Sequence, residues 1–138
     1  MKKLITIVAF LLISSSALLA QDKPYNVVFD ITSRDTVVHR MVLRWITEIL
    51  KESPNANLEV VFYAKSLDLV VEGKSIAAEE VKNLVKRKNV TFNVCDVAMK
   101  NNKVEKSQLL PGVKTVPDGI YEIISKQADG WGYIKVSQ

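Results

Sequence analysis

The side chain best suited to chemistry is the only cysteine of the chain, Cys95. It closes the run Val90–Cys95, which has the apolar composition of a buried strand. A thiolate is a strong nucleophile toward sulfur, and a single cysteine cannot form a disulfide within its own chain. Cys95 is therefore buried and inert, paired with another molecule, or used for chemistry.

Few other side chains offer a comparable reaction. His39 is the only histidine, and helical periodicity places it on an apolar face, where a core or interface role is more common than a catalytic one. One histidine and one cysteine are too few ligands for a structural zinc site within one chain. The sequence contains no defensible Ser/His/Asp or Cys/His constellation, which argues against a classical hydrolase. We predict no metal and no cofactor.

The N-terminal segment has the features of an export signal. Two lysines precede an apolar stretch at residues 4–13, and small residues follow it. Residues 1–20 are therefore interpreted as a signal peptide, with cleavage after Ala17 or after Ala20. An anchor that stays attached is the alternative, but the stretch is shorter than the ~20 residues that span a bilayer. We expect an exported protein, periplasmic or secreted, without a stable membrane anchor.

Charge argues against a protein that binds polyanions. The full chain has 19 Lys and Arg and 15 Asp and Glu residues, and loss of two lysines with the signal leaves a net charge of +2. The one basic run, Lys82 with residues 86–88, falls on a predicted helix and its end, where it complements the helix dipole. Interleaved aromatic residues are missing, so we expect no nucleic-acid partner.

Apolar and amphipathic segments alternate along residues 21–138, which have the length of one domain with one core. The expected strands are residues 25–31, 58–63, 90–95, 112–116 and 131–136. The expected helices are residues 37–52, 66–71, 76–88, 97–100 and 117–128. This alternation favours a mostly parallel sheet covered on both faces. The predicted fold class is α/β, a flavodoxin-like three-layer sandwich with a mostly parallel sheet of about five strands.

Capping residues mark the starts of several expected helices. Ser75 and Asp96 are each suited to cap a helix, and Pro117 suits a first helical turn. Residues 32–36, Thr-Ser-Arg-Asp-Thr, supply caps for the longest helix. Their hydroxyls and N–H groups could also bind a phosphate, but the segment has no glycine that would allow close approach. We therefore favour capping and predict no flavin.

The first expected helix has an unusually wide apolar face. At 3.6 residues per turn, its apolar side chains cover an arc of roughly 200°, whereas one sheet normally covers little more than a ~100° stripe. These side chains are Val38, Met41, Val42, Leu43, Trp45, Ile46, Ile49 and Leu50. The excess favours a second covered surface, most simply a subunit interface. Coverage by other segments of the same chain is the alternative.

The expected position of Cys95 favours reactivity. In parallel α/β sheets, ligands and catalytic groups collect beyond the carboxyl ends of the strands, where Cys95 lies. A thiol beside a helix N-terminus meets free N–H groups that stabilise its thiolate, whereas the carboxylate of Asp96 opposes this effect. Unpaired cysteines are also often simply buried.

Four ordered segments carry a family resemblance. They are Cys-Asp-Val-Ala-Met at 95–99, Leu-Leu-Pro-Gly-Val at 109–113, Val-Pro-Asp-Gly-Ile at 116–120 and Gly-Trp-Gly-Tyr-Ile-Lys at 130–135. Together they resemble the exported, single-domain branch of the DsrE/DsrF-like family, whose name comes from intracellular sulfur oxidation. The resemblance covers most of residues 21–138, from Tyr25 onward, and rests on the ordered set of segments at this spacing.

The resemblance implies a flavodoxin-like domain over residues 21–138 that assembles as a homo-oligomer, a trimer or hexamer. It also implies that Cys95 matches the family cysteine at the end of the central strand. In sulfur-relay members that cysteine carries a persulfide and passes the sulfur to a partner thiol. Those members work in the cytoplasm, whereas this chain is expected to be exported. The donor and acceptor are therefore left open, as a thiol partner protein or a small sulfur species.

Three functional classes follow for the exported protein. The first is a sulfur carrier that transfers a persulfide through Cys95. The second is a non-catalytic oligomeric module that binds a small ligand or anion at the carboxyl ends of the strands. The third is an assembly in which the cysteine only packs. Exposure and reactivity of Cys95 separate the first class from the other two.

Overall fold

The computed structural model describes residues 25–137, so the predicted signal at residues 1–20 lies outside the described part. The strands are β1 (Asn26–Ile31), β2 (Asn57–Phe62), β3 (Val90–Cys95), β4 (Lys114–Val116) and β5 (Gly132–Val136). The α-helices are α2 (Thr36–Glu52), α3 (Ala78–Leu84), α4 (Asp96–Asn101) and α5 (Gly119–Ala128). Two short 3₁₀ helices are η2 (Ser66–Val70) and η3 (Lys106–Gln108).

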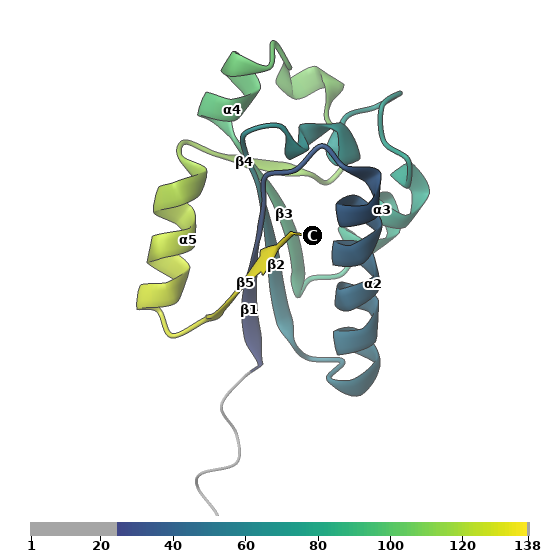
Figure 1. Ribbon diagram of the computed structural model, residues 1–138. Helices are drawn as coiled ribbons and strands as arrows, with labels where there is room; N and C mark the ends of the chain where they lie inside the picture. Colours follow the sequence, from purple (N-terminus) through teal and green to yellow (C-terminus); the bar gives the residue numbers. More distant parts are fainter. Residues whose placement is uncertain (1–24, 138) are drawn as a thin grey trace, which may run out of the picture.

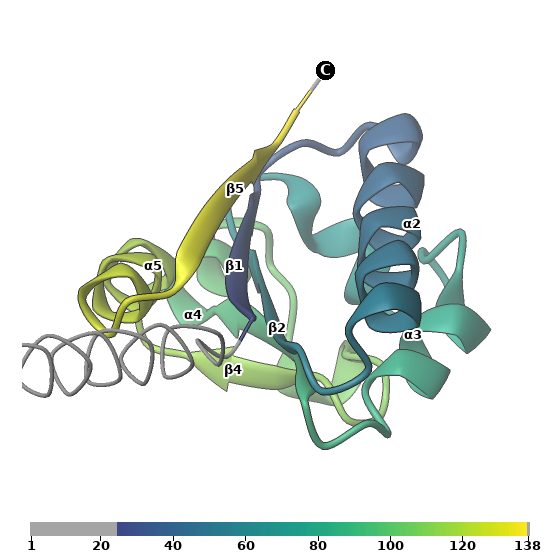
Figure 2. The same cartoon turned by 90° about the horizontal axis from the view of Figure 1, so that it is seen from below.

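Within the described residues, five strands form one parallel sheet in the order β4-β3-β2-β1-β5. Helices α2 and α3 cover one face, and α5 lies against the other (Figures 1 and 2). The predicted flavodoxin-like three-layer sandwich is therefore confirmed, and the sheet is parallel throughout. The chain steps outward from β1 to β4 and then returns through α5, which places β5 on the free side of β1.

The two faces of the sheet have different compositions. On one face, Phe29 and Ile31 join the large apolar cluster that also contains the buried side chains of α2. Phe62 and Phe92 belong to the same cluster, with ring centroids 5.5 Å apart. The opposite face has a much smaller apolar cluster, in which strand residues meet Ile123 of α5. Most of the apolar burial thus lies between the sheet and the α2 side.

Helix α2 begins as the sequence predicted. The N-cap is Asp35, whose Oδ1 accepts the Val37 N–H at 2.8 Å. The wide apolar arc is covered by the chain itself, with Val38, His39, Val42, Leu43, Ile46 and Leu50 buried and Met41, Trp45 and Ile49 partly buried against the same core. Intramolecular packing therefore covers most of the arc, and assembly into an oligomer stays a prediction.

Three helix boundaries differ from the expectation, each for a local reason. Helix α3 covers fewer residues than 76–88. Before its start, Ser75 Oγ accepts the Ala77 N–H in a turn. Beyond its end, Arg87 donates to the Pro54 carbonyl. Helix α5 starts at Gly119 with Asp118 as its N-cap, so Pro117 lies before the helix.

Helix α4 starts at Asp96, so the expectation that Asp96 caps it is wrong. Cys95 is the N-cap residue, although its side chain makes no capping hydrogen bond. Strand β3 therefore runs directly into α4, with no loop between them.

Candidate functional site

Cys95 lies at the carboxyl end of β3, as the sequence predicted, and pairs in register with Val116 of β4. The residue is 5% exposed, and it is a free cysteine. The next side chain, Asp96, lies 3.5 Å from Lys106 Nζ. That ammonium partly offsets the negative charge beside the thiol.

The first turn of α5 packs closely against Cys95. A Cβ atom placed on Gly119 would lie 3.1 Å from Cys95 Cβ and 3.1 Å from Val61 Cγ1, closer than ordinary side-chain contacts. Only glycine allows this approach without a shift of its neighbours. Asp118 caps this helix by accepting the N–H groups of Ile120 (2.8 Å) and Tyr121 (3.1 Å).

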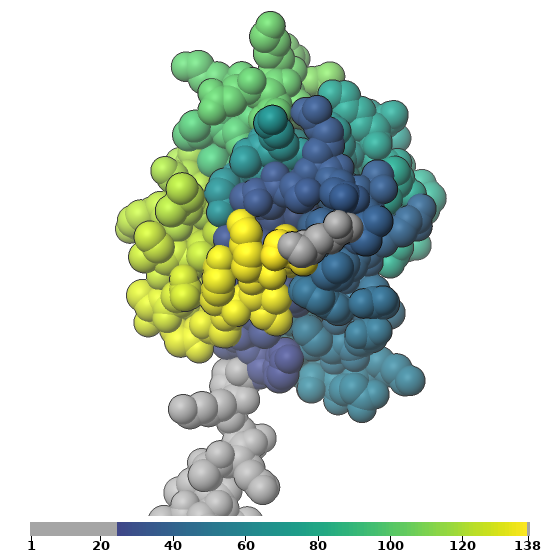
Figure 3. All heavy atoms as spheres, viewed as in Figure 1, coloured from purple at the N-terminus to yellow at the C-terminus, as the bar shows by residue number. Residues whose placement is uncertain are grey.

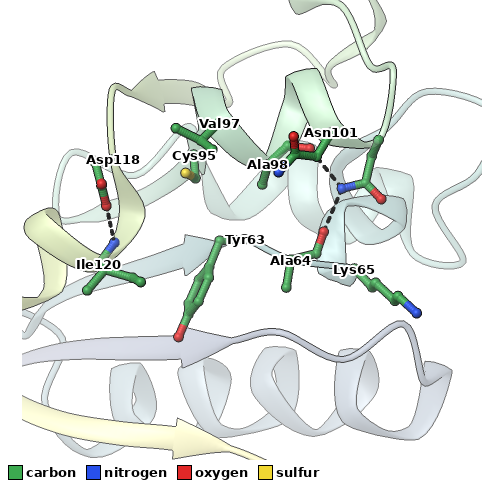
Figure 4. A pocket seen from close by; sticks show the side chains of 10 residues that line it. Tyr63, Ala64, Lys65, Cys95, Val97, Ala98, Asn101, Asp118 and Ile120 are labelled. Carbon is green, nitrogen blue, oxygen red and sulfur yellow. Dashed lines mark hydrogen bonds between the residues drawn. The ribbon is translucent and has the colours of Figure 1, made fainter.

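A pocket of about 470 Å³ opens beside the thiol (Figure 4). Cys95, Asp118 and Ile120 lie at one end, and Lys65 lies at the other. The walls between them are formed by Tyr63, Ala64, Val97, Ala98, Asn101 and Asn102. The combination of apolar walls with a few polar groups is typical of small-molecule sites.

The loop that forms one wall of the pocket is held in an uncommon conformation. Ala64 has φ 55°, a left-handed value that costs free energy for a residue with a side chain. The Asn102 amide nitrogen donates to the Ala64 carbonyl at 2.6 Å and to the Ala98 carbonyl at 2.8 Å, which joins the loop to α4 (Figure 4). Ser66 Oγ donates to the Ile31 carbonyl at 2.8 Å. These bonds fix the pocket wall in place.

A buried carboxylate lies on the other side of Tyr63. Asp30, 4% exposed, accepts hydrogen bonds from the Tyr133 hydroxyl at 2.6 Å and from Lys135 Nζ at 2.9 Å. The bond from Tyr133 raises the pKa of that phenol to about 12, and burial together with Asp30 raises the pKa of Tyr63. Both phenols therefore stay protonated at neutral pH. Lys135 and Tyr133 belong to β5, which lies at the molecular surface (Figure 3).

A second polar network holds α5 on the sheet. Glu59, 3% exposed, accepts from Asn93 Nδ2 at 2.9 Å and pairs with Lys126 Nζ at 2.9 Å. The same ammonium lies 4.6 Å from the centre of the Trp131 ring. Burial and the neighbouring Glu59 raise the pKa of Glu122. The network anchors the helix whose start packs against Cys95.

The other residues considered from sequence lie apart from this pocket. His39 is buried, and its Nε2–H donates to the Ser33 carbonyl at 2.9 Å. Burial lowers the pKa of His39, although Ser33, Asp68 and Asp35 oppose the shift. Ser33 Oγ accepts the Asp35 N–H at 3.0 Å within the loop, and the expected capping of α2 is made by Asp35 itself.

The described part of the chain offers neither a cluster suited to a metal ion nor a helix suited to span a membrane. No group of three or more His, Cys, Asp or Glu side chains there is placed to hold a metal ion. Likewise, no helix between residues 25 and 137 is long and apolar enough to cross a membrane.

Sequence reasoning found Cys95 but missed most of its neighbours. Tyr63, Lys65, Asn102 and Asp118 come from three separate segments, and no spacing in the sequence relates them. The only available signal was the position of each segment after a strand, because the carboxyl ends of parallel strands meet at one edge of the sheet.

Comparison with known proteins gives a family and a shared fold. A model of the DsrE/DsrF-like family matches residues 17–136. No curated protein matches the chain. A protein of unknown function from Methanobacterium thermoautotrophicum has a similar structure, with a TM-score of 0.76 and 25% identity over 80% of this chain and 98% of that one.

Two further solved structures have lower sequence identity. The ychN protein from E. coli has a TM-score of 0.68 at 12% identity, over 82% of this chain and 99% of that one. A conserved protein of unknown function from Bacteroides thetaiotaomicron has a TM-score of 0.66 at 14% identity, over 81% of this chain and 95% of that one. These similarities extend over nearly the full neighbours and concern the fold alone.

Proposed function

Because the chain belongs to the DsrE/DsrF-like family, we propose that it is an exported sulfur carrier that holds a persulfide on Cys95 and passes the sulfur to a partner thiol. The observation that carries this proposal is the position of Cys95 at the end of a pocket of about 470 Å³, beyond the carboxyl end of a central strand. Ligands of parallel α/β sheets bind in this region.

The transfer takes two balanced steps. The Cys95 thiolate attacks the outer sulfur of a donor R–S–SH, so that a new S–S bond forms while the donor bond breaks and RS⁻ leaves. An acceptor thiolate then attacks the outer sulfur of Cys95–S–SH, and the Cys95 thiolate leaves. One neutral sulfur atom moves in each step, so no external oxidant or reductant is needed. A single cysteine per chain suffices because the second thiol belongs to the acceptor.

The surroundings of Cys95 support such a carrier. At 5% exposure, the thiol is shielded from bulk solvent and is approached through the pocket. The first residue of α5 packs against the cysteine and holds it beside the pocket. A shielded persulfide is protected from stray thiols until an acceptor enters.

The direct test is intact-mass spectrometry of the purified mature protein before and after incubation with polysulfide or thiosulfate. We expect a gain of ~32 Da, the mass of one sulfur, that is lost on reduction. The matched control is Cys95→Ser, which should gain nothing. The same spectrum tests the prediction of export, because the mass identifies cleavage after Ala17 or after Ala20.

The proposal fails if wild-type protein gains no sulfur and Cys95 also resists alkylation in the folded state. That result would favour the second candidate, a non-catalytic module whose pocket binds a small ligand while the cysteine only packs. The low exposure of Cys95 is the observation that favours this candidate. Native mass spectrometry of Cys95→Ser would then show a ligand that survives purification.

We further propose that the protein is a homo-oligomer, a trimer or hexamer, as the family resemblance implies. Apolar side chains exposed within the described residues gather on α5, where Ile120 and Ile124 are each 58% exposed and Tyr121 is 72% exposed. A second copy of the chain is the occupant that we expect for this stripe. Light scattering should give a multiple of the mature mass, and Tyr121→Glu should reduce it. A monomeric wild-type protein would refute the assembly.

A further inference from the structure

The pocket beside Cys95 has two ends that differ in chemistry. Cys95 and Asp118 lie at one end, whereas Lys65 extends from the wall at the other (Figure 4). Lys65 is exposed and forms no ion pair with any residue between 25 and 137. The pocket therefore has a nucleophile at one end and an ammonium that lacks an anionic partner in the described chain at the other.

The middle of the pocket is suited to a carbon skeleton. Between the two ends, methyl groups of Ala64, Val97 and Ala98 form much of the wall. The volume of about 470 Å³ lies within the range of ~300–1,000 Å³ that is usual for sites of organic ligands. A water molecule in the liquid takes up about 30 Å³, so an inorganic species of two or three atoms would leave most of this pocket to solvent.

Building on the proposed function, we propose that the sulfur donor is a low-molecular-mass organic persulfide that carries a carboxylate and has the size of an amino acid or short peptide. The carboxylate pairs with Lys65, the carbon skeleton lies along the apolar walls, and the terminal sulfur reaches Cys95. The reaction is Cys95–S⁻ + R–S–SH → Cys95–S–SH + R–S⁻, in which RS⁻ leaves with the electrons of the broken S–S bond. Lys65 is thus a specificity-determining residue.

A matched pair of donors tests the role of the carboxylate. N-acetylcysteine persulfide and N-acetylcysteinamide persulfide have nearly the same shape and differ in one carboxylate. Loading of Cys95 is followed by rapid quench and intact mass at increasing donor concentration. With wild-type protein we expect saturation for the acid and a loading rate about threefold higher than for the amide, the effect of one solvent-exposed ion pair. Raising the salt concentration to about 0.5 M should reduce that preference.

Substitutions assign the preference to one ammonium. Lys65→Gln should load the acid and the amide at equal rates, so that the preference of the wild type for the acid is lost. Lys100→Gln is the control, because Lys100 is exposed on α4 but does not line the pocket. We expect this variant to keep the full preference for the acid. A protein destabilised by substitution would lose rate with both donors, so the ratio of rates distinguishes recognition from folding.

An inorganic disulfide donor separates failure of this inference from failure of the proposed function. Suppose that inorganic disulfide (HS–S⁻) loads Cys95, but that the wild type shows neither saturation with the organic acid nor a preference for it over the amide. The organic donor is then refuted, and the carrier function stands. A preference that persists in Lys65→Gln also refutes the inference. If no donor adds ~32 Da to Cys95, the carrier function fails, and the donor proposal fails with it.

Discussion

The two faces of the sheet are built on different physical principles. The face toward α2 and α3 is sealed by apolar packing, with Phe29, Phe62 and Phe92 fully buried. The face toward α5 has only a small apolar cluster and instead buries the carboxylates Asp30 and Glu59. Apolar burial is non-directional, whereas buried carboxylates require partners at defined positions. The first face therefore contributes most of the stability, and the second fixes the positions of side chains and of α5.

This difference explains why the candidate site lies at the end of the α5 face. The ion pair between Lys126 and Glu59 holds α5 on the sheet. The first residue of this helix, Gly119, packs against Cys95. Pocket walls also depend on single polar contacts, such as the one from Asn102 to Ala64. Substitutions on the first face should change stability alone, and substitutions on the second should change stability and reactivity together.

The largest expected effect on stability lies on the apolar face. Phe92→Ala removes a ring that is 0% exposed and packs against Phe62. We expect the free energy of unfolding to fall by about 3–5 kcal/mol, because transfer and cavity costs add. Urea unfolding measures the loss. The folded fraction should still load sulfur at the wild-type rate per molecule, and a slower rate would show that the two faces are not separable.

A smaller loss is expected where a buried charge loses its partner. Lys126→Met keeps most of the side-chain stem but removes the ammonium that pairs with Glu59. The carboxylate of Glu59 then keeps its hydrogen bond from Asn93. We expect a loss of about 3 kcal/mol, because an uncompensated buried carboxylate is costly. The double variant Glu59→Gln with Lys126→Met should regain most of it. If the single and double variants unfold at the same urea concentration, the pair is not what holds α5.

The next effect separates reactivity from stability. Gly119→Ala forces a Cβ against Cys95 and Val61, each 3.1 Å away. We expect a loss of about 1–2 kcal/mol from overpacking and a clear change in the loading rate of Cys95. Gly132→Ala is the matched control, because its Cβ would lie 3.5 Å from the Asn26 carbonyl oxygen, an ordinary contact. Equal loading rates in the two variants would show that the start of α5 does not position the thiol.

The contrast between the faces also explains what the sequence predicted and what it missed. Strands such as Val90–Cys95 were predictable because apolar composition is local, and the α/β class followed from their alternation with helices. The pairing of β5 with β1 was not predictable, because it depends on the return path through α5. For the same reason, Asp30 and Lys135 are 105 residues apart in the chain but bonded in the structure.

The smallest expected effect concerns His39 on the apolar face. Burial lowers the pKa of its imidazole, so the unfolded chain takes up a proton more readily than the folded protein. Above the unfolded pKa of about 6.5 both states are neutral and no cost arises, whereas stability falls as the pH drops below that value. The slope from one group is at most about 1.4 kcal/mol per pH unit.

The free energy of unfolding of His39→Gln, measured with urea between about pH 5 and 8, should depend less steeply on pH than that of the wild type. This range is the one in which histidine titrates. Because the nearby carboxylates Asp35 and Asp68 are present in both proteins, the difference between the two slopes isolates the imidazole, and identical slopes would mean that His39 is as readily protonated in the fold as in the unfolded chain.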